Sequence, residues 1–397
     1  MRHRRWCCIL GAVLAGLGSG PARALPQDAY VWQRHWTPAL ADALVGSADL
    51  VRHWRVLAAE MGAGGHLRAM AIDQAALAAS HRPVVLVIRI DGQLTDWTRQ
   101  DTAAQIGALL ARWRQGPVPI AGLEIDHDCA TARLASYAAF LAVLRQQLQG
   151  TLPLSVTALA TWLGAADLDR VVEASDEVVL QVHAVLSPLG GLFEAGQARD
   201  WIDRMAARTS KPFDVALPAY GARVAWHDDG SLLSVESEQP LLSGDANATE
   251  LIVEPEAVAG LLQDLKARPP PHLAGIVWFR LPTAEDRRAW SPATWRAVVR
   301  GDPLTGRIEA QARPGDAPGL LAVSVENLGG TDAPLPRRVE VAGTCMLGDG
   351  GDGYRLDRQA QTLAFVRVGA GMLHEQGHRA IGWLRCDGDQ VALHVEP

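Results

Sequence analysis

The segment Ala121–Asp128, AGLEIDHD, has the pattern of a barrel strand. Its acidic side chains, Glu124, Asp126 and Asp128, alternate with apolar ones, as side chains do along an extended strand. A longer stretch with helical periodicity, Arg133–Leu148, follows it. A strand with one apolar face and one acidic face is typical of a barrel, where the outer face packs on helices and the inner face points to the axis.

The alternation of a short strand with a longer helix continues on both sides of this segment. The predicted strands are Tyr30–Trp36, Trp54–Met61, Val84–Asp91, Ala121–Asp128, Leu154–Leu159, Glu177–His183, Phe213–Tyr220 and Gly275–Leu281. Eight strands alternating with helices over about 250 residues predict an α/β fold, a (β/α)8 TIM-like barrel. An open doubly wound sheet is the alternative, but the Gly-rich phosphate turn that usually follows its first strand is absent from this sequence.

At two places, the alternation of strands and helices breaks off, which indicates an insertion and a second domain. Residues 222–248 contain Asp228–Gly230, a sequence that favours a hairpin turn, and we expect a β-rich insertion on the face where barrel active sites lie. After Pro303, short strands separated by Gly, Asp and Pro turns replace the alternation. We therefore predict a barrel over residues 25–303 and an all-β, sandwich-like domain over residues 304–397.

Residues 1–24 have the layout of a secretory signal peptide. Residues 2–5 are basic, Trp6–Leu17 is apolar, and Ala22–Ala24 is a small-x-small cleavage site. A membrane anchor is the alternative, but the apolar run is too short to span a bilayer. We expect a soluble, periplasmic or secreted protein with no stable membrane insertion.

Net charge and cysteine content limit the kinds of partner and cofactor that we expect. Removal of residues 1–24 takes away four arginines and no acids, which changes the formal charge from −7 to −11. A chain this acidic has no general attraction for nucleic acid. Cys345 and Cys386 lie in one C-terminal segment and are the plausible disulfide pair after export, which leaves Cys129 free. The spacing of these three cysteines matches no metal-ligand pattern. We expect no cofactor, and the sequence does not indicate an oligomeric state.

Strand alternation predicts which polar side chains point into the barrel. They are Arg89, Asp91, Glu124, Asp126, Asp128, Gln181 and His183. We expect Arg89 to be the counter-ion of Glu124 deep in the barrel, and Asp126 and Asp128 to lie nearer the C-terminal mouth, where active sites form in such folds. A carboxyl group held protonated by a neighbouring carboxylate is suited to general acid catalysis.

Two other interpretations of these acids stay open. A buried ion network that only stabilises the barrel would also shift their pKa values. A metal site could use the three acids together with His127, but alternation should point His127 away from the acids, and we expect no metal.

The same residues carry a resemblance to the family 18 chitinase-like glycoside hydrolases. GLEIDHD resembles that family's fourth-strand signature, which ends in three acids at alternate positions, and Leu217–Gly221 (LPAYG) is similar to its GxPxYG seventh strand. The resemblance implies that Asp128 protonates the glycosidic oxygen, with Asp126 as its partner and Glu124 one step deeper. The candidate catalytic residues are therefore Asp128, Asp126 and Glu124. The family has Glu where this chain has Asp128, so a mechanism with two carboxylates is the alternative to catalysis assisted by the substrate's acetamido group.

Substrate contacts follow from the same resemblance and from composition. Trp278 resembles the floor tryptophan of the eighth strand, and Gln181 and His183 occupy sixth-strand positions that contact substrate in that family, where a Tyr is common in place of His183. The chain has 13 Trp, more than its five Phe and four Tyr together, and indole faces suit sugar rings, although most Trp residues serve packing. The candidate substrate-binding residues are Trp32, Arg89, Asp91, Gln181, His183, Tyr220 and Trp278.

The whole chain, through Ala29–Trp36 (AYVWQRHW) and Gly122–Asp128, also resembles a bacterial family described as domain of unknown function 3142. Two functions follow as hypotheses. The first is an exported glycoside hydrolase that acts on a cell-envelope or extracellular glycan by carboxylate general acid/base catalysis. The alternative is a non-catalytic carbohydrate-binding protein on a hydrolase-like barrel. Fold alone does not separate them, and we favour the enzyme because inward acids without a use are destabilising.

Overall fold

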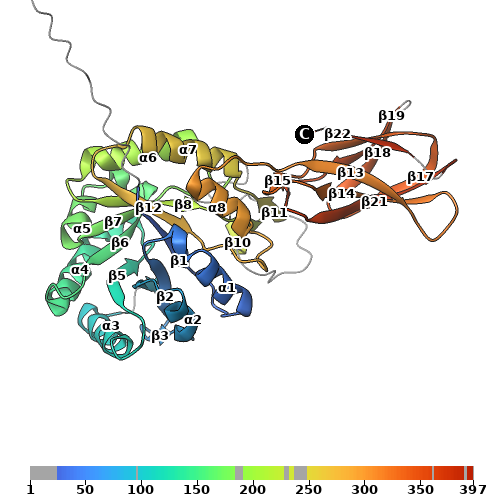
Figure 1. Cartoon of the computed structure of the whole chain (residues 1–397). Coiled ribbons are helices and arrows are strands. Elements are labelled where there is room, and N and C mark those ends of the chain that lie inside the picture. Colours follow the sequence, from blue (N-terminus) through green and yellow to red (C-terminus); the bar gives the residue numbers. More distant parts are fainter. Residues whose placement is uncertain are drawn as a thin grey trace, which may run out of the picture.

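The structure is a computed structural model that describes residues 25–94, 97–183, 191–227, 232–236, 248–359, 362–388 and 391–396. The expected signal peptide (residues 1–24) and the expected hairpin turn at Asp228–Gly230 lie outside the described residues. A barrel surrounded by helices is followed by a pair of antiparallel sheets, drawn in orange to red in Figure 1. Within the described residues, no helix is long and apolar enough to cross a membrane.

Eight parallel strands form the closed barrel that the sequence predicts. They are β1 (Gln27–Val31), β2 (Trp54–Met61), β4 (Val84–Ile90), β5 (Ile120–Asp126), β6 (Leu154–Leu159), β7 (Glu177–Gln181), β8 (Phe213–Pro218) and β12 (Leu273–Phe279). The ring closes because β1 pairs in parallel with both β2 and β12. A short strand, β3 (Leu67–Ala69), adds to β2 in antiparallel orientation.

Helices pack around the outside of the barrel (Figure 1). They are α1 (Pro38–Gly46), α2 (Gln74–Ala79), α3 (Arg99–Trp113), α4 (Leu134–Leu148), α5 (Leu168–Ala174), α6 (Ala195–Arg208), α7 (Pro255–Ala267) and α8 (Pro292–Arg300). The bounds of α8 follow from its sequence: the Ser291 hydroxyl accepts a hydrogen bond from the N–H of Thr294, and Gly301 ends the helix with a φ of 79°, a left-handed conformation that favours glycine.

Side chains of the barrel strands alternate between two cores. Leu123 and Ile125 of β5 belong to the large core between barrel and helices, whereas Glu124 and Asp126 point to the axis. A second, smaller core fills the middle of the barrel. We call its aliphatic part the apolar belt; it consists of Leu57, Val87, Val179, Ala216 and Val277.

The insertion after β8 is a three-stranded antiparallel sheet, in the order β10 (Leu232–Glu236), β9 (Ala222–Trp226) and β11 (Ala248–Leu251). The C-terminal part forms two four-stranded antiparallel sheets and one short pair. The first sheet is β13 (Ile308–Pro314), β14 (Leu320–Asn327), β21 (His378–Cys386) and β17 (Cys345–Gly350). The second is β18 (Tyr354–Gln359), β19 (Thr362–Arg367), β16 (Arg338–Ala342) and β22 (Ala392–Glu396), and the pair is β15 (Ala333–Pro334) with β20 (Met372–Leu373). Side chains of both four-stranded sheets share one core, which makes a sandwich.

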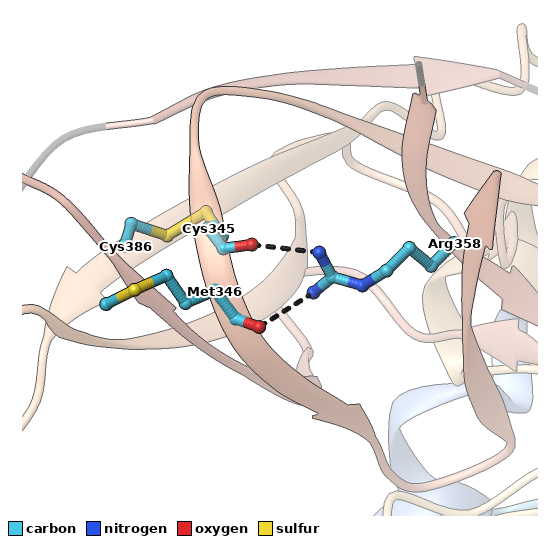
Figure 2. The surroundings of a disulfide bond; sticks show 4 residues. All are labelled: Cys345, Met346, Arg358 and Cys386. Atoms are coloured by element: carbon cyan, nitrogen blue, oxygen red, sulfur yellow. Dashed lines mark hydrogen bonds between the residues drawn. A yellow bond between two sulfur atoms is a disulfide. The ribbon is translucent and has the colours of Figure 1, made fainter. Parts of the chain in front are cut away.

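A disulfide joins Cys345 of β17 to Cys386 of β21, which face each other in the strand register. The pairing expected from sequence is confirmed, and Cys129 is free and buried. Figure 2 shows Arg358 beside this bond, where its guanidinium donates to the carbonyl oxygens of Cys345 at 2.9 Å and Met346 at 3.5 Å. Arg358 belongs to β18, so these bonds tie the edge of the first sheet to the second.

Candidate functional site

A network of ion pairs occupies the floor of the barrel, near the N-terminal ends of its strands. Its centre is Arg55 of β2, which is 2% exposed. One guanidinium nitrogen pairs with Glu124, and another donates to Asp28 at 3.1 Å, Glu177 at 2.8 Å and Asp214 at 2.8 Å. This network compensates the deepest of the three acids in GLEIDHD and holds it away from the mouth.

The expected pairing of Arg89 with Glu124 is wrong. The register of β4 and β5 places Val87 beside Glu124 and Arg89 beside Asp126. Arg89 therefore lies one layer nearer the mouth, and Glu124 takes its counter-ion, Arg55, from β2.

Above the apolar belt, a cavity of about 340 Å³ opens at the C-terminal end of the strands. Seven of the predicted site residues line it: Trp32, Arg89, Asp126, Asp128, Gln181, His183 and Tyr220. Tyr30, Thr157 and Phe279 line it as well, although the sequence did not single them out. The cavity combines aromatic walls with a few convergent polar groups, as ligand sites commonly do.

The two acids at the mouth share one cation. Arg89 lies 2.9 Å from a carboxylate oxygen of Asp126 and 3.9 Å from one of Asp128. The Thr157 hydroxyl donates to Asp126 at 2.8 Å, and the Gln181 amide donates to Asp128 at 3.5 Å. Asp126 is buried, whereas 33% of the Asp128 side chain is exposed, so Asp128 is the acid that a bound molecule can reach.

Burial and mutual repulsion favour a proton on this pair. Burial and the neighbouring Asp128 raise the pKa of Asp126 to about 6, against the opposing effects of Arg89 and Thr157. Burial also raises the pKa of Asp128, and Arg89 and Gln181 oppose the rise. The pair therefore holds a proton in mildly acidic solution, which is a requirement of general acid catalysis.

One wall of the cavity is built around His183. Its ring stacks on Phe279, with centroids 5.4 Å apart, and its Nδ1 lies 3.3 Å from the Tyr220 hydroxyl. Burial lowers the pKa of His183 to about 4, so the imidazole is neutral near pH 7. Its Nε2 is buried and has no hydrogen-bond partner within the described residues.

Two predicted binding residues lie elsewhere. Trp278 faces the helices, where it packs against Trp290 and Trp295, because alternation along β12 puts Val277 and Phe279 inside. The inward-facing aromatic ring of β12 is therefore that of Phe279, and the prediction for Trp278 is wrong.

The prediction for Asp91 is also wrong. Since β4 ends at Ile90, the chain has already turned, and Asp91 is an exposed residue whose carboxylate accepts from the N–H of Gln93 at 2.9 Å.

His127 points away from the acids, as alternation predicts. Its Nδ1 lies 3.1 Å from the carbonyl oxygen of Ile90, and its ring packs against Trp97 and Tyr137. Among the residues that the structure describes, no group of three or more His, Cys, Asp or Glu side chains is arranged to hold a metal ion.

The family model described as "Domain of unknown function (DUF3142)" matches residues 80–284, just over half of the 397 residues. The chain belongs to this family. The match covers β4 to β12 and so includes the acids of β5 and most of the cavity wall in this DUF3142 protein. A second model, "Domain of unknown function (DUF8456)", matches residues 310–387 in the sandwich. No curated protein matches the chain.

Solved structures share the fold of the barrel. A chitinase from Chromobacterium violaceum ATCC 12472 superposes with a TM-score of 0.50 at 16% identity, over 70% of this chain and 98% of its own. The spore cortex-lytic enzyme SleL from Bacillus megaterium QM B1551 does so with a TM-score of 0.51 at 14% identity, over 70% of this chain and 74% of its own. The DUF3142 protein therefore has a glycoside-hydrolase-like fold.

Proposed function

We propose that this protein is an exported glycoside hydrolase that acts on a cell-envelope or extracellular glycan. The observation that carries the proposal is the pair Asp126 and Asp128, held by Arg89 in a cavity at the C-terminal mouth of the barrel. Active sites of such barrels form at this face.

The pair divides the work of a general acid between a buried and an accessible carboxyl group. Asp128 reaches the cavity and would give a proton to the glycosidic oxygen as the bond from that oxygen to the anomeric carbon breaks. Asp126 lies behind it, and its raised pKa allows the pair to keep a proton until substrate arrives. Water then completes hydrolysis, and its proton returns to the carboxylate.

The walls of the cavity support a sugar as the ligand. Trp32 and Phe279 present aromatic rings, and their centroids are 5.3 Å apart. His183 and Gln181 add hydrogen-bonding groups beside Asp128. A sugar ring needs this combination, because its faces are apolar and its edges carry hydroxyl groups.

Carbohydrate binding without catalysis is the second candidate, and one observation favours it. Asp128 has a side chain one methylene shorter than Glu, and Gln181 at 3.5 Å and Arg89 at 3.9 Å hold it against the wall. A proton donor held in this way reaches less far toward a glycosidic oxygen.

A screen with wild type and two variants tests the proposal. Chitin oligosaccharides, peptidoglycan fragments and other polysaccharides are incubated with wild type, with Asp128→Asn, and with the matched control Asp200→Asn, an exposed aspartate of α6. Loss of a general acid should lower the rate by about 10²–10⁴-fold in Asp128→Asn and leave sugar affinity and the control unchanged. Hydrolysis by Asp128→Asn at the wild-type rate contradicts the assignment, and the absence of hydrolysis by wild type, with glycan binding retained, favours the second candidate.

Export rests on the signal-peptide pattern of residues 1–24. Fractionation of producing cells followed by N-terminal sequencing should find the protein outside the cytoplasm with Leu25 as its first residue. A cytoplasmic protein that keeps residues 1–24 would contradict export and leave the chemistry of the cavity unaffected.

A further inference from the structure

A second cavity, of about 670 Å³, lies between the barrel and the C-terminal sandwich. We call it the inter-domain groove. Gly221 and Ala289, from the connections after β8 and β12, form its barrel side, and Gly353 and Val368 from the sandwich form the other. Connections that follow the C-terminal ends of barrel strands lie at the mouth, so the groove is on the same face as the candidate site.

The groove and the site cavity share Tyr220. On the cavity side, its hydroxyl lies 3.3 Å from His183. On the groove side, its backbone forms a β-bridge with Ala289. Tyr220 therefore stands between the cavity and the groove, which makes the two hollows neighbours on one face of the barrel.

Buried polar contacts fix the distance between the two walls. The carboxylate of the buried Asp332 accepts from the N–H of Ser291 at 2.8 Å, and its own N–H donates to the Thr294 hydroxyl at 2.6 Å. The ring of His374 lies 3.1 Å from the carbonyl oxygen of Ala289. These bonds join the start of α8 and the preceding loop to the sandwich, so both domains build one preformed groove.

The lining of the groove combines apolar and hydrogen-bonding side chains. Ile252 and Val368 contribute apolar surface, and Val368 is 63% exposed. Arg379 and the ion pair of Arg288 with Glu250, at 3.2 Å, contribute charged groups that can bind hydroxyls. A chain of sugar rings presents the complementary surface, because each ring has apolar faces and a polar edge.

We propose that the inter-domain groove binds the part of a glycan that extends beyond the barrel cavity, so that the sandwich forms part of the substrate site. This inference rests on the proposed function and deepens it, since it makes the substrate a long chain. The barrel cavity, at 340 Å³, is near the lower end of the about 300–1,000 Å³ typical of ligand sites and leaves a long chain to be bound elsewhere.

Affinity measured as a function of chain length tests this inference. The groove variants are Val368→Ser and Arg379→Ala; the matched control is Arg385→Ala, an exposed arginine on the same strand, β21, and outside the groove. Each substitution is made in full-length Asp128→Asn, which lacks the proposed acid, and binding is followed by titration calorimetry. The probes are chitobiose and chitohexaose, and the peptidoglycan disaccharide and hexasaccharide.

We expect each groove variant to weaken hexasaccharide binding about 10-fold and disaccharide binding less than about 2-fold, and the control to change neither. Equal effects on both lengths, or none on either, overturn the inference. A wild type that cleaves no glycan while groove variants still lose hexasaccharide affinity refutes the hydrolase and keeps the groove. Cleavage by wild type, together with groove variants whose hexasaccharide affinity is unchanged, supports the hydrolase and overturns the groove. If no probe binds, the result counts against both proposals.

Discussion

Substitution of Arg55 by Met is the most direct test of the barrel floor. Met keeps most of the length of the side chain and removes the charge. Within the described residues, the fully buried Glu124 then loses the one cationic side chain that it pairs with. Asp214 loses its contact with Arg55 at 2.8 Å and keeps Arg52 at 4.0 Å. The change therefore leaves the buried Glu124 with no compensating charge, whereas Asp28 and Asp214 keep Arg52.

The expected cost follows from the burial of the network. Removal of one partner from a buried ion pair destabilises proteins by about 3–5 kcal/mol. That is a large part of the about 5–15 kcal/mol by which a folded domain is stable. For a barrel of this size, we expect the melting temperature to fall by on the order of 5–10 °C.

The deficit should depend on pH in a defined direction. Burial raises the pKa of Glu124, and Arg55 opposes that rise, so the substitution raises the pKa further. A carboxyl group with a higher pKa in the folded than in the unfolded state binds its proton more tightly when folded. Its stabilising effect is present below the unfolded pKa of about 4.3 and is lost as pH rises through the folded pKa. The difference between wild type and Arg55→Met should therefore be larger at pH 7 than at pH 4.5.

Urea unfolding followed by circular dichroism at both pH values measures this difference. Arg52→Met is the matched control, because Arg52 also pairs with Asp28, at 3.0 Å, but is 42% exposed. Because solvent screens the exposed guanidinium of Arg52 and the buried Asp28 keeps Arg55 at 3.1 Å, Arg52→Met should cost less stability than Arg55→Met. The floor network is refuted as a stabilising element if Arg55→Met costs no more than Arg52→Met, or if its cost is the same at both pH values.

Three further predictions concern the mouth, the disulfide and the eighth strand. The pKa of Asp126 is about 6, against an ordinary 3.8, so its deprotonation should cost the folded protein on the order of 3 kcal/mol of stability as pH rises from 4 to 7. In urea unfolding, Asp126→Asn should therefore lose less stability than wild type over that range, and an identical pH dependence would contradict the assignment. The pair Cys345 and Cys386, 41 residues apart, should give a two-hydrogen mass increase on reduction and a loss of about 4 kcal/mol in the double Ala variant, whereas an unchanged mass excludes the bond. Trp278→Phe should lower the melting temperature and leave glycan affinity unchanged, whereas Phe279→Ala should weaken affinity; the opposite result would restore the indole as the sugar platform.

Sequence alternation located the acids of β5 because the two-residue period of a strand does not depend on its neighbours. It did not locate their partners, because those depend on register. The pairing of β2 with β4 shifts between Leu57 and Ala59, and that of β4 with β5 shifts between Val84 and Val85. Such irregularities move an inward-pointing side chain by one layer along the barrel axis, and no local sequence pattern predicts them. A signal for Arg55 was nevertheless present, as a charged residue within an apolar strand.

The eighth strand shows a different limit. In GIVWFRL, positions 275–281, residues on both faces are mainly apolar, so alternation cannot tell the inner from the outer side. The resemblance to a known family pointed to Trp278, and the structure puts Phe279 in the cavity. Tyr30 and Thr157 were missed for a related reason. Both are ordinary strand residues, and only the closed barrel brings Tyr30 beside Glu124 and Thr157 beside Asp126.

The charge balance at the mouth links the two proposed functions to pH. Arg89 supplies one positive charge to two carboxylates, so full ionisation of Asp126 and Asp128 leaves an excess negative charge in a cavity with buried walls. A bound proton removes this excess, and the pKa of Asp126, about 6, sets the range in which it is held. General acid catalysis needs that proton, so hydrolysis should decline as pH rises above about 6. Binding alone needs contacts with the aromatic walls, which do not titrate in this range, so a pH profile of turnover and of affinity in one buffer series separates the hydrolase from the binding protein.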